Sequence, residues 1–275
     1  MLEYPEAKTI ARQIGETLSG KTIAGVTLEQ TPHKFAFFMA DKELYANMLA
    51  GETIRGAAQH GGFVEINTER AMLYFSDGAF PRYFSADEKP PAKHQFLLRF
   101  TDGAHLAVSI QMYGFIGVSP FGRCEEKYYR LAVDKPDPLG RDFIYEYFRG
   151  LYDGNAGKMS AKAFLATEQR IPGLGNGVLQ DILWNARIHP RRAMNTLCED
   201  DFRTLYQSVT STLKEMCEAG GRSTEKDLFG NPGGYAARLS KNTLGSPCPR
   251  CGTAIEKEAY LGGAVYFCRG CQRKA

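Results

Sequence analysis

The chain has 275 residues, a formal net charge of +3 at pH 7, 43% hydrophobic residues and 24% charged residues. This composition is typical of a globular protein with hydrophobic cores, and it excludes disordered and collagen-like chains. No apolar stretch approaches the roughly eighteen residues that a membrane span needs, so we expect no contact with a membrane.

The first 118 residues are predicted to form a helix followed by a β-rich region. Apolar residues recur at helical spacing over 5–18, with Pro5 suited to the first turn and Ser19-Gly20 to the end of the helix. From residue 21 onward, short strand-like runs alternate with Gly, Asp and Pro, and a short helix interrupts them over 40–51. This spacing predicts a β-sandwich or a barrel.

The second half of the chain is predicted to be helical. Residues 134–142, DKPDPLGRD, have the proline and glycine content of a linker. Helical patterns follow over 158–169, 176–188 and 198–221, and the last of these carries a continuous apolar stripe. Between the first two lies RIPGLGNG, a tight turn that opens into a helix at Asn176, where backbone N–H groups can bind a phosphate. Plain capping of that helix by Asn176 is the alternative interpretation.

Four of the seven cysteines form two C-x-x-C pairs near the C-terminus, Cys248 with Cys251 and Cys268 with Cys271. This spacing is typical of a tetrahedral Zn²⁺ site, which leaves no open position for catalysis. Two disulfides are the alternative, but nothing in the sequence indicates secretion. We predict one structural Zn²⁺ ion, bound in a ribbon whose hairpin bends near Gly262-Gly263.

The predicted fold class is α+β, and positive charge gathers at its C-terminal end. Residues 222–275 carry a net charge of +5, so the first 221 residues carry about −2. A phosphate-binding surface and a solvated basic tail both fit this distribution. The expected segments are an N-terminal helix with a β-sandwich over 1–130, a linker over 131–150, a helical domain over 151–240 and a zinc ribbon over 241–275.

Together these features resemble the formamidopyrimidine-DNA glycosylase and endonuclease VIII family. The resemblance rests on the N-terminal LEYPE, on IPGLGN, on STEKDLFGNPGGY and on the two C-x-x-C pairs, and it covers nearly the whole chain. It implies a helix–two-turn–helix fold for the helical domain. It also implies base-excision repair: a DNA glycosylase and AP lyase for oxidised bases, which binds double-stranded DNA with a damaged base or an abasic site. We expect a cytoplasmic, nucleoid-associated monomer, since no targeting signal is present.

The resemblance implies roles for individual residues. In this family an N-terminal amine attacks C1′ of the sugar and forms a Schiff base, while a neighbouring glutamate moves protons. The four candidates for the chemistry are Met1, Leu2, Glu3 and Glu6. The candidates for DNA contact are His60, Tyr113, Lys162, Asn176 and Arg269, among which Tyr113 falls where the family has a wedge phenylalanine.

The sequence departs from the family where the chemistry occurs. The family nucleophile is usually a proline at position 2, whereas this chain has Leu2, so we expect Met1 to remain and the amine to be displaced by one residue. Cationic contacts are also missing. The family's lysine aligns near His60, its paired arginines align with Gln111 and Met112, and its hairpin arginine aligns with Gly263.

Three hypotheses follow. The first is a glycosylase with lyase activity through the amine of Met1 or Leu2, or a hydrolytic variant in which Glu3 activates water. The second is a catalytically silent protein that binds lesions, in which Glu3 and Glu6 are a helix-start pair favoured by the helix dipole. The third is a zinc-ribbon protein with a protein partner, which leaves IPGLGN and the basic C-terminus without a role. We favour the enzyme.

Overall fold

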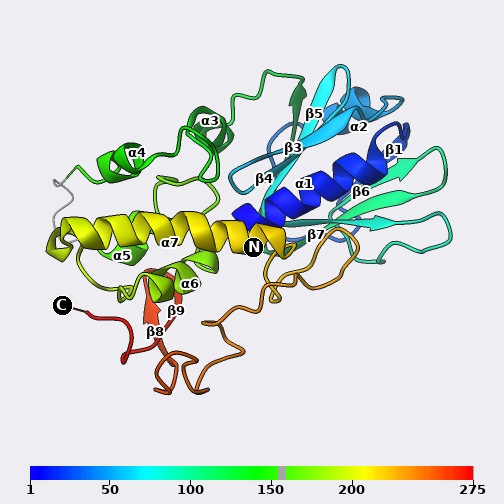
Figure 1. Cartoon of the computed structure of the whole chain (residues 1–275). Coiled ribbons are helices and arrows are strands. Elements are labelled where there is room, and N and C mark those ends of the chain that lie inside the picture. The colour runs from blue at the N-terminus through cyan, green and yellow to red at the C-terminus, as the bar shows by residue number, and fades with distance from the viewer. Residues whose placement is uncertain (154–158, 275) are drawn as a thin grey trace.

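A β-rich half and a helical half meet at the N-terminus of the chain (Figure 1). The computed structural model describes residues 1–153 and 159–274. Its strands are β1 (Ile23–Leu28), β2 (Ala36–Phe38), β3 (Gly56–His60), β4 (Phe63–Asn67), β5 (Ala71–Phe84), β6 (Phe96–Phe100), β7 (His105–Pro120), β8 (Glu256–Tyr260) and β9 (Gly263–Phe267). Its helices are α1 (Tyr4–Leu18), α2 (Lys42–Leu49), α3 (Lys127–Asp134), α4 (Tyr145–Gly150), α5 (Ala161–Ala166), α6 (Val178–Asn185), α7 (Glu199–Glu218) and the 3-10 turn η1 (Met194–Thr196).

Seven strands form one continuous sheet in the order β1-β6-β7-β5-β4-β3, with the short β2 parallel to β7. The long strands β5 and β7 pair along almost their whole length, so each belongs to both halves of the predicted sandwich. The first part of β5 also pairs with β4, and the first part of β7 pairs with β6. A register shift between Asp77 and Ala79 separates the two halves.

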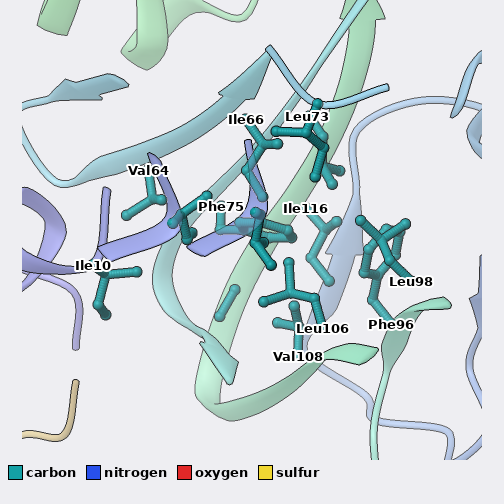
Figure 2. Close-up of a cluster of buried hydrophobic side chains, with 14 of the residues drawn as sticks. Ile10, Val64, Ile66, Leu73, Phe75, Phe96, Leu98, Leu106, Val108 and Ile116 are labelled. Carbon is teal, nitrogen blue, oxygen red and sulfur yellow. The ribbon is translucent and has the colours of Figure 1, made fainter. Parts of the chain in front are cut away.

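The core of the β-rich half lies between α1 and the sheet. Helical spacing places Ile10, Ile14 and Leu18 on one fully buried face of α1. They belong to the same hydrophobic cluster as Val64 of β4 and Phe75 of β5 (Figure 2). Each fully buried side chain of this size contributes about 1.5–3 kcal/mol to folding, so α1 is firmly held on the sheet.

A second core fills the helical half, and α1 also contributes to it. The predicted apolar stripe of α7 is buried, from Phe202 to Met216, and Tyr4 of α1 packs into the same cluster. The Tyr4 hydroxyl donates to Asp137 Oδ1 at 2.6 Å. As a result, α1 and α7 meet at their ends beside the N-terminus (Figure 1).

The elements of the second half differ in extent from their predicted ranges. The helix predicted over 158–169 is observed as α5, and its first residue, Lys158, lies outside the described residues. The range predicted as a linker, 131–150, contains the end of α3 and all of α4, and its Phe143 and Phe148 are buried in the helical core. Apolar residues in this range pack against α7, which a count of proline and glycine does not reveal.

The C-terminal ribbon packs on α6. Strands β8 and β9 form an antiparallel hairpin that turns at Leu261-Gly262. Gln180 of α6 holds this hairpin, because its amide donates to the Ala264 carbonyl and accepts from the Tyr266 N–H. Across residues 1–153 and 159–274, none of the helices combines the length and the hydropathy that crossing a bilayer requires.

Candidate functional site

A cavity of about 280 Å³ lies where the two halves of the molecule meet. The N-terminus, the β5 bulge, the RIPGLGNG turn and the tip of the β8–β9 hairpin contribute to its wall. Six residues that the sequence singled out come together here: Met1, Leu2, Glu3, Tyr113, Lys162 and Asn176.

The first two residues place the α-amine at this cavity. The N–H of Leu2 donates to the Asp77 carbonyl at 2.5 Å in an isolated β-bridge, and the Leu2 side chain is 4% exposed. The Leu2 nitrogen is therefore tied to β5. The Met1 amine lies beyond it, 3.5 Å from Glu225 Oε2. In this structure the α-amine at the cavity is that of Met1, and it is paired with Glu225.

The Glu3 carboxylate caps α6 from a distance of 174 residues along the chain. Its Oε1 accepts from the Gly177 N–H at 2.8 Å, and its Oε2 accepts from the Val178 N–H at 2.7 Å. These are the N–H groups that a helix start leaves without partners, and an anion is favoured there. Asn176 does not cap the helix, so that interpretation is wrong. A Cβ at Gly175 would lie 2.6 Å from Glu3 Oε1, which explains the glycine there.

Arg222, to which the sequence analysis gave no role, joins Glu3 and Glu6. Its backbone N–H, Nε and Nη2 donate to the Glu6 carboxylate at 3.1, 3.0 and 2.8 Å, and its Nη1 lies 3.5 Å from Glu3 Oε2. All three side chains are buried. Burial lowers the pKa of Arg222, but Glu3 and Glu6 outweigh this effect and raise it overall. Glu6 therefore lies behind the cavity as a structural partner of Arg222. The nearest sequence signal was the pair of glutamates in the first turns of α1.

Two further carboxylates lie beside the amine. The sequence indicates a surface or turn position for Asp77, not an acid/base role, and it indicates no role for Glu225. Glu225 follows Arg222 by three residues, and burial raises its pKa, against the lowering effect of the N-terminal amine and Arg222. Asp77 lines the cavity at the β5 bulge with a φ of 57°, and burial raises its pKa although Ser76 and the N-terminal amine lower it. A raised carboxyl pKa beside an amine suits proton transfer.

Lys162 and Asn176 converge on the hairpin tip. Lys162 Nζ donates to the Tyr260 carbonyl at 2.6 Å, and Asn176 Nδ2 donates to the Ala264 carbonyl at 2.9 Å. Burial lowers the pKa of Lys162. Asn176 Oδ1 is buried without a hydrogen-bond partner. The turn, α5 and the ribbon thus bring an ammonium and an amide to the same edge of the cavity.

Two candidates for DNA contact lie elsewhere. His60 is on β3, where its Nε2 is 3.6 Å from Glu65 Oε2 and its ring centroid is 5.8 Å from that of Tyr129. Arg269 is exposed on the ribbon, and its Nε lies 2.8 Å from Glu256 Oε1. Tyr113, by contrast, lines the cavity and is 37% exposed.

The four ribbon cysteines form a cluster that can hold a metal ion. Their sulfur atoms all lie within 4.8 Å of one another. The Cys248–Cys271 and Cys251–Cys268 Sγ separations are 3.7 and 3.4 Å, too long for disulfides, so the disulfide alternative is wrong. A tetrahedral ion with metal–sulfur bonds of about 2.3 Å places its sulfur ligands about 3.8 Å apart, so an all-thiolate donor set of this size fits one such ion.

Comparison with known proteins gives the family. The pattern of the formamidopyrimidine-DNA glycosylase N-terminal domain matches residues 1–114, and that of the formamidopyrimidine-DNA glycosylase H2TH domain matches residues 135–227. The formamidopyrimidine-DNA glycosylase of Cytobacillus firmus is 30% identical, over 99% of this chain and 100% of the relative. That of Bacillus licheniformis is 29% identical over the full length of both.

Solved structures show the same fold. The Lactococcus lactis Fpg in a complex with DNA containing an abasic site superposes with a TM-score of 0.84 at 22% identity, covering 99% of this chain and 100% of that one. The same protein bound to DNA containing an N7-benzyl-Fapy-dG gives 0.84 at 23% identity. With matches over both halves and a relative aligned over its whole length, this chain belongs to the formamidopyrimidine-DNA glycosylase family.

Proposed function

We propose that this protein is a DNA glycosylase and AP lyase of base-excision repair that acts through the α-amine of Met1. Family membership over the whole chain supports this function. The observation that carries the proposal is the position of the amine: it lies at the cavity that Glu3, Lys162 and Asn176 also line. The substrate is double-stranded DNA with a damaged base or an abasic site, the kind of DNA bound in the structures with the same fold.

The reaction begins with attack of the neutral Met1 nitrogen on C1′ of the damaged nucleotide. The C1′–N bond to the base breaks, and the base takes up one of the two amine protons. The other proton passes to O4′ as the C1′–O4′ bond opens, which gives a Schiff base between the Met1 nitrogen and C1′. Removal of a proton from C2′ then expels the 3′ phosphate by β-elimination. Glu225 Oε2 lies 3.5 Å from the amine, and we assign Glu225 the transfer of the amine proton because burial raises its pKa.

Glu3 acts as a fixed charge in this mechanism. Its two oxygens accept from two backbone N–H groups and lie beside Arg222, so the carboxylate cannot turn freely. A preorganised anion at the cavity stabilises the positive charge that develops at C1′ as the base leaves. Glu6 holds Arg222, which in turn holds Glu3. Leu2 fixes the start of the chain on β5.

Lys162 and Asn176 are proposed to bind phosphates that flank the damaged nucleotide. Both side chains have donors at the cavity edge, and the RIPGLGNG turn presents them together with the hairpin tip. Each phosphate neutralised by a cation, as proposed for Lys162, adds about 0.9 to the magnitude of the slope of log K against log salt. Contacts to phosphates carry no sequence information, so replacement of Asn176 by alanine should weaken binding to all sequences alike. A loss confined to one sequence would indicate base readout.

We propose that the four cysteines hold one structural Zn²⁺ ion, which pins the hairpin tip at the cavity. Metal analysis should find one zinc ion per chain, and Cys251→Ser should release it and weaken duplex binding. Cys198→Ser is the matched control, because Cys198 is an exposed free thiol outside the cluster. Unchanged affinity in the metal-free protein would contradict this role for the ribbon.

Borohydride trapping on DNA with an abasic site tests the function. A covalent adduct is expected, and mass spectrometry of its peptides should place it on Met1. Glu225→Gln should slow trapping by about 10²–10⁴-fold, the usual contribution of general acid–base catalysis, whereas Glu16→Gln, an exposed control on α1, should not. Tight binding to the abasic site without an adduct would favour the alternative, a catalytically silent protein that binds lesions.

We further propose that the protein works as a monomer in the cytoplasm, associated with the nucleoid. The two hydrophobic cores support a β-rich domain over 1–130 and a helical domain over 151–240, followed by the ribbon over 241–275. Phe143 and Phe148 of the range 131–150, predicted as a linker, belong to the helical core. His60 and Arg269, which lie away from the cavity, are proposed to contact more distant parts of the DNA backbone.

A further inference from the structure

A separate cavity of about 630 Å³ lies at the cysteine end of the ribbon, and the proposed mechanism does not use it. Residues that follow α6, the first turns of α7 and the ribbon form the wall of this ribbon cavity. It shares no lining residue with the cavity at the N-terminus, which the hairpin tip lines. Since β8 and β9 have five residues each, at about 3.3 Å per residue, the two ends of the ribbon are about 15 Å apart.

Positive charge dominates the wall of the ribbon cavity. Its four arginines are Arg187, Arg192, Arg250 and Arg273. Asp201 is the one carboxylate in its lining. Cys251 and Cys271 also line it, and with one zinc ion the four thiolates carry a charge of −2, of which these two hold about half. The wall therefore keeps a formal charge of about +2, which favours an anion.

The protein itself holds two of the four arginines in place. Arg250 Nη1 donates to the Trp184 carbonyl at 2.9 Å, and the Arg250 guanidinium lies 4.0 Å from the centroid of the Trp184 ring. Arg192 Nη2 donates to Asp201 Oδ2 at 2.8 Å. Arg192 is therefore already paired, whereas Arg250 is fixed without a counter-charge and is preorganised for an oxyanion.

The other two arginines have no partner. Arg187 and Arg273 are exposed, and within the part of the chain that the structure describes neither side chain makes an ion pair or a hydrogen bond. The Arg273 N–H donates to the Arg187 carbonyl at 3.2 Å, which keeps the two residues together. Arg187 has a φ of 57°, which glycine adopts at lower cost than arginine. An arginine here thus indicates a role for its side chain.

The lining of the ribbon cavity favours a phosphate backbone over a free nucleotide. Guanidinium groups bind phosphate oxygens through paired hydrogen bonds. Among the described residues, this lining contains no aromatic ring that could stack on a base. A ligand bound here is recognised by its phosphates, as DNA is when a protein binds it without sequence preference.

We propose that the ribbon cavity binds the backbone of a second DNA duplex while the cavity at the N-terminus holds the damaged nucleotide. The choice of DNA as the ligand rests on the proposed function. The two sites have separate walls, so both can be occupied at once. A protein with two such sites can contact a neighbouring duplex before it releases the first, which speeds its transfer along and between DNA segments.

The test uses the full chain saturated with a short duplex that carries a reduced abasic-site analogue. An undamaged duplex with a different dye is then added, and its anisotropy reports the second binding step. Arg187→Ala combined with Arg273→Ala should weaken this step by about fivefold or more and lower the magnitude of its salt slope by about 1.8, the share of two phosphate contacts. Affinity for the first duplex should be unchanged.

Two further variants make the test specific. Arg12→Ala combined with Arg55→Ala is the matched control, because it removes the same charge from exposed side chains that line neither cavity. Thr204→Glu is an independent change, since Thr204 is exposed on α7 and lines the ribbon cavity, and glutamate suits a helix. The added carboxylate should weaken the second step while the chain keeps its one zinc ion.

A wild-type complex that takes up no second duplex would overturn the proposal, as would equal uptake by the wild type and the arginine variant. Equal weakening of the first duplex would also overturn it, because the arginines would then belong to the main DNA contact. Sodium phosphate should compete no better than sodium chloride of the same ionic strength; stronger competition would assign the cavity to free phosphate instead. Failure of the proposed function is distinguishable, because a wild type that gives no borohydride adduct can still be scored for uptake of the second duplex.

Discussion

The buried guanidinium of Arg222 joins α1, α6 and the segment after α7, and its removal tests how the site is held together. Arg222→Met keeps the length and the apolar character of the side chain but removes the positive charge. Two side-chain hydrogen bonds to Glu6 and the ion pair with Glu3 are lost. Glu3 and Glu6, 4% and 3% exposed, are then left without a counter-charge.

The expected cost is about 3–5 kcal/mol, the range for breaking a buried ion pair by removal of one partner. This is a large part of the roughly 5–15 kcal/mol that stabilises a typical protein. Urea unfolding followed by far-ultraviolet circular dichroism measures it. Arg12→Met is the matched control: Arg12 pairs with Glu16 on α1, both side chains are 60% exposed, and the expected change is within about 0.5 kcal/mol.

A double variant separates charge from packing. Adding Glu6→Gln to Arg222→Met removes one of the two uncompensated charges, so we expect the double variant to recover at least about 1 kcal/mol relative to Arg222→Met. A loss in Arg222→Met as small as in the Arg12→Met control would refute the reasoning. A further loss on adding Glu6→Gln would also refute it, because the carboxylate would then be stabilising without its partner.

Three other changes have expected outcomes. Gly78→Ala should lower the free energy of unfolding, measured by thermal unfolding, by about 1–3 kcal/mol, because its Cβ would lie 1.9 Å from the Gln111 carbonyl oxygen. Gly15→Ala, in the open middle of α1, should raise the free energy of unfolding by about 0.5–1 kcal/mol. Burial raises the pKa of Asp77 above its ordinary value of 3.8, so the ionised form of this side chain destabilises the fold. Asp77→Asn should therefore be more stable than the wild type at about pH 7. This gain in the free energy of unfolding should vanish below about pH 4, where the carboxyl is protonated in both the folded and the unfolded state. A gain that persists in acid would contradict this. Gly263→Arg should tighten duplex binding and raise the salt slope by about 0.9, since a Cβ there makes only ordinary contacts of 3.4 Å and longer; an unchanged slope would show that the hairpin tip does not reach a phosphate.

Short-range sequence patterns predicted the elements that such patterns define, namely amphipathic helices and the cysteine ribbon. The spacing of apolar residues located α1 and α7, and the two C-x-x-C pairs located the ribbon and its hairpin. The sequence marks glycine as a break between short strand-like runs, and a run that ends at Gly78 makes β5 too short. Gly78 lies within the paired length of β5 and β7, where the backbones approach too closely for a side chain.

The site was predictable only in part for a related reason. The family resemblance brought Glu3, Lys162 and Asn176 to attention, and the structure places all three at one cavity. Arg222 and Glu225 were missed because their partners lie 216 and 224 residues away along the chain. No periodicity or motif marks an ion pair between the first turn of one helix and the segment that follows another.

Helix α1 contributes Ile10 and Ile14 to one core and Tyr4 to the other. The two halves therefore cannot be exchanged between relatives as independent modules. In a chimera joined near residue 130, Tyr4 would come from one parent and the helical core that surrounds it from the other. Recombination within this family should therefore succeed only where the first turn of α1 and the helices that pack against it are inherited together.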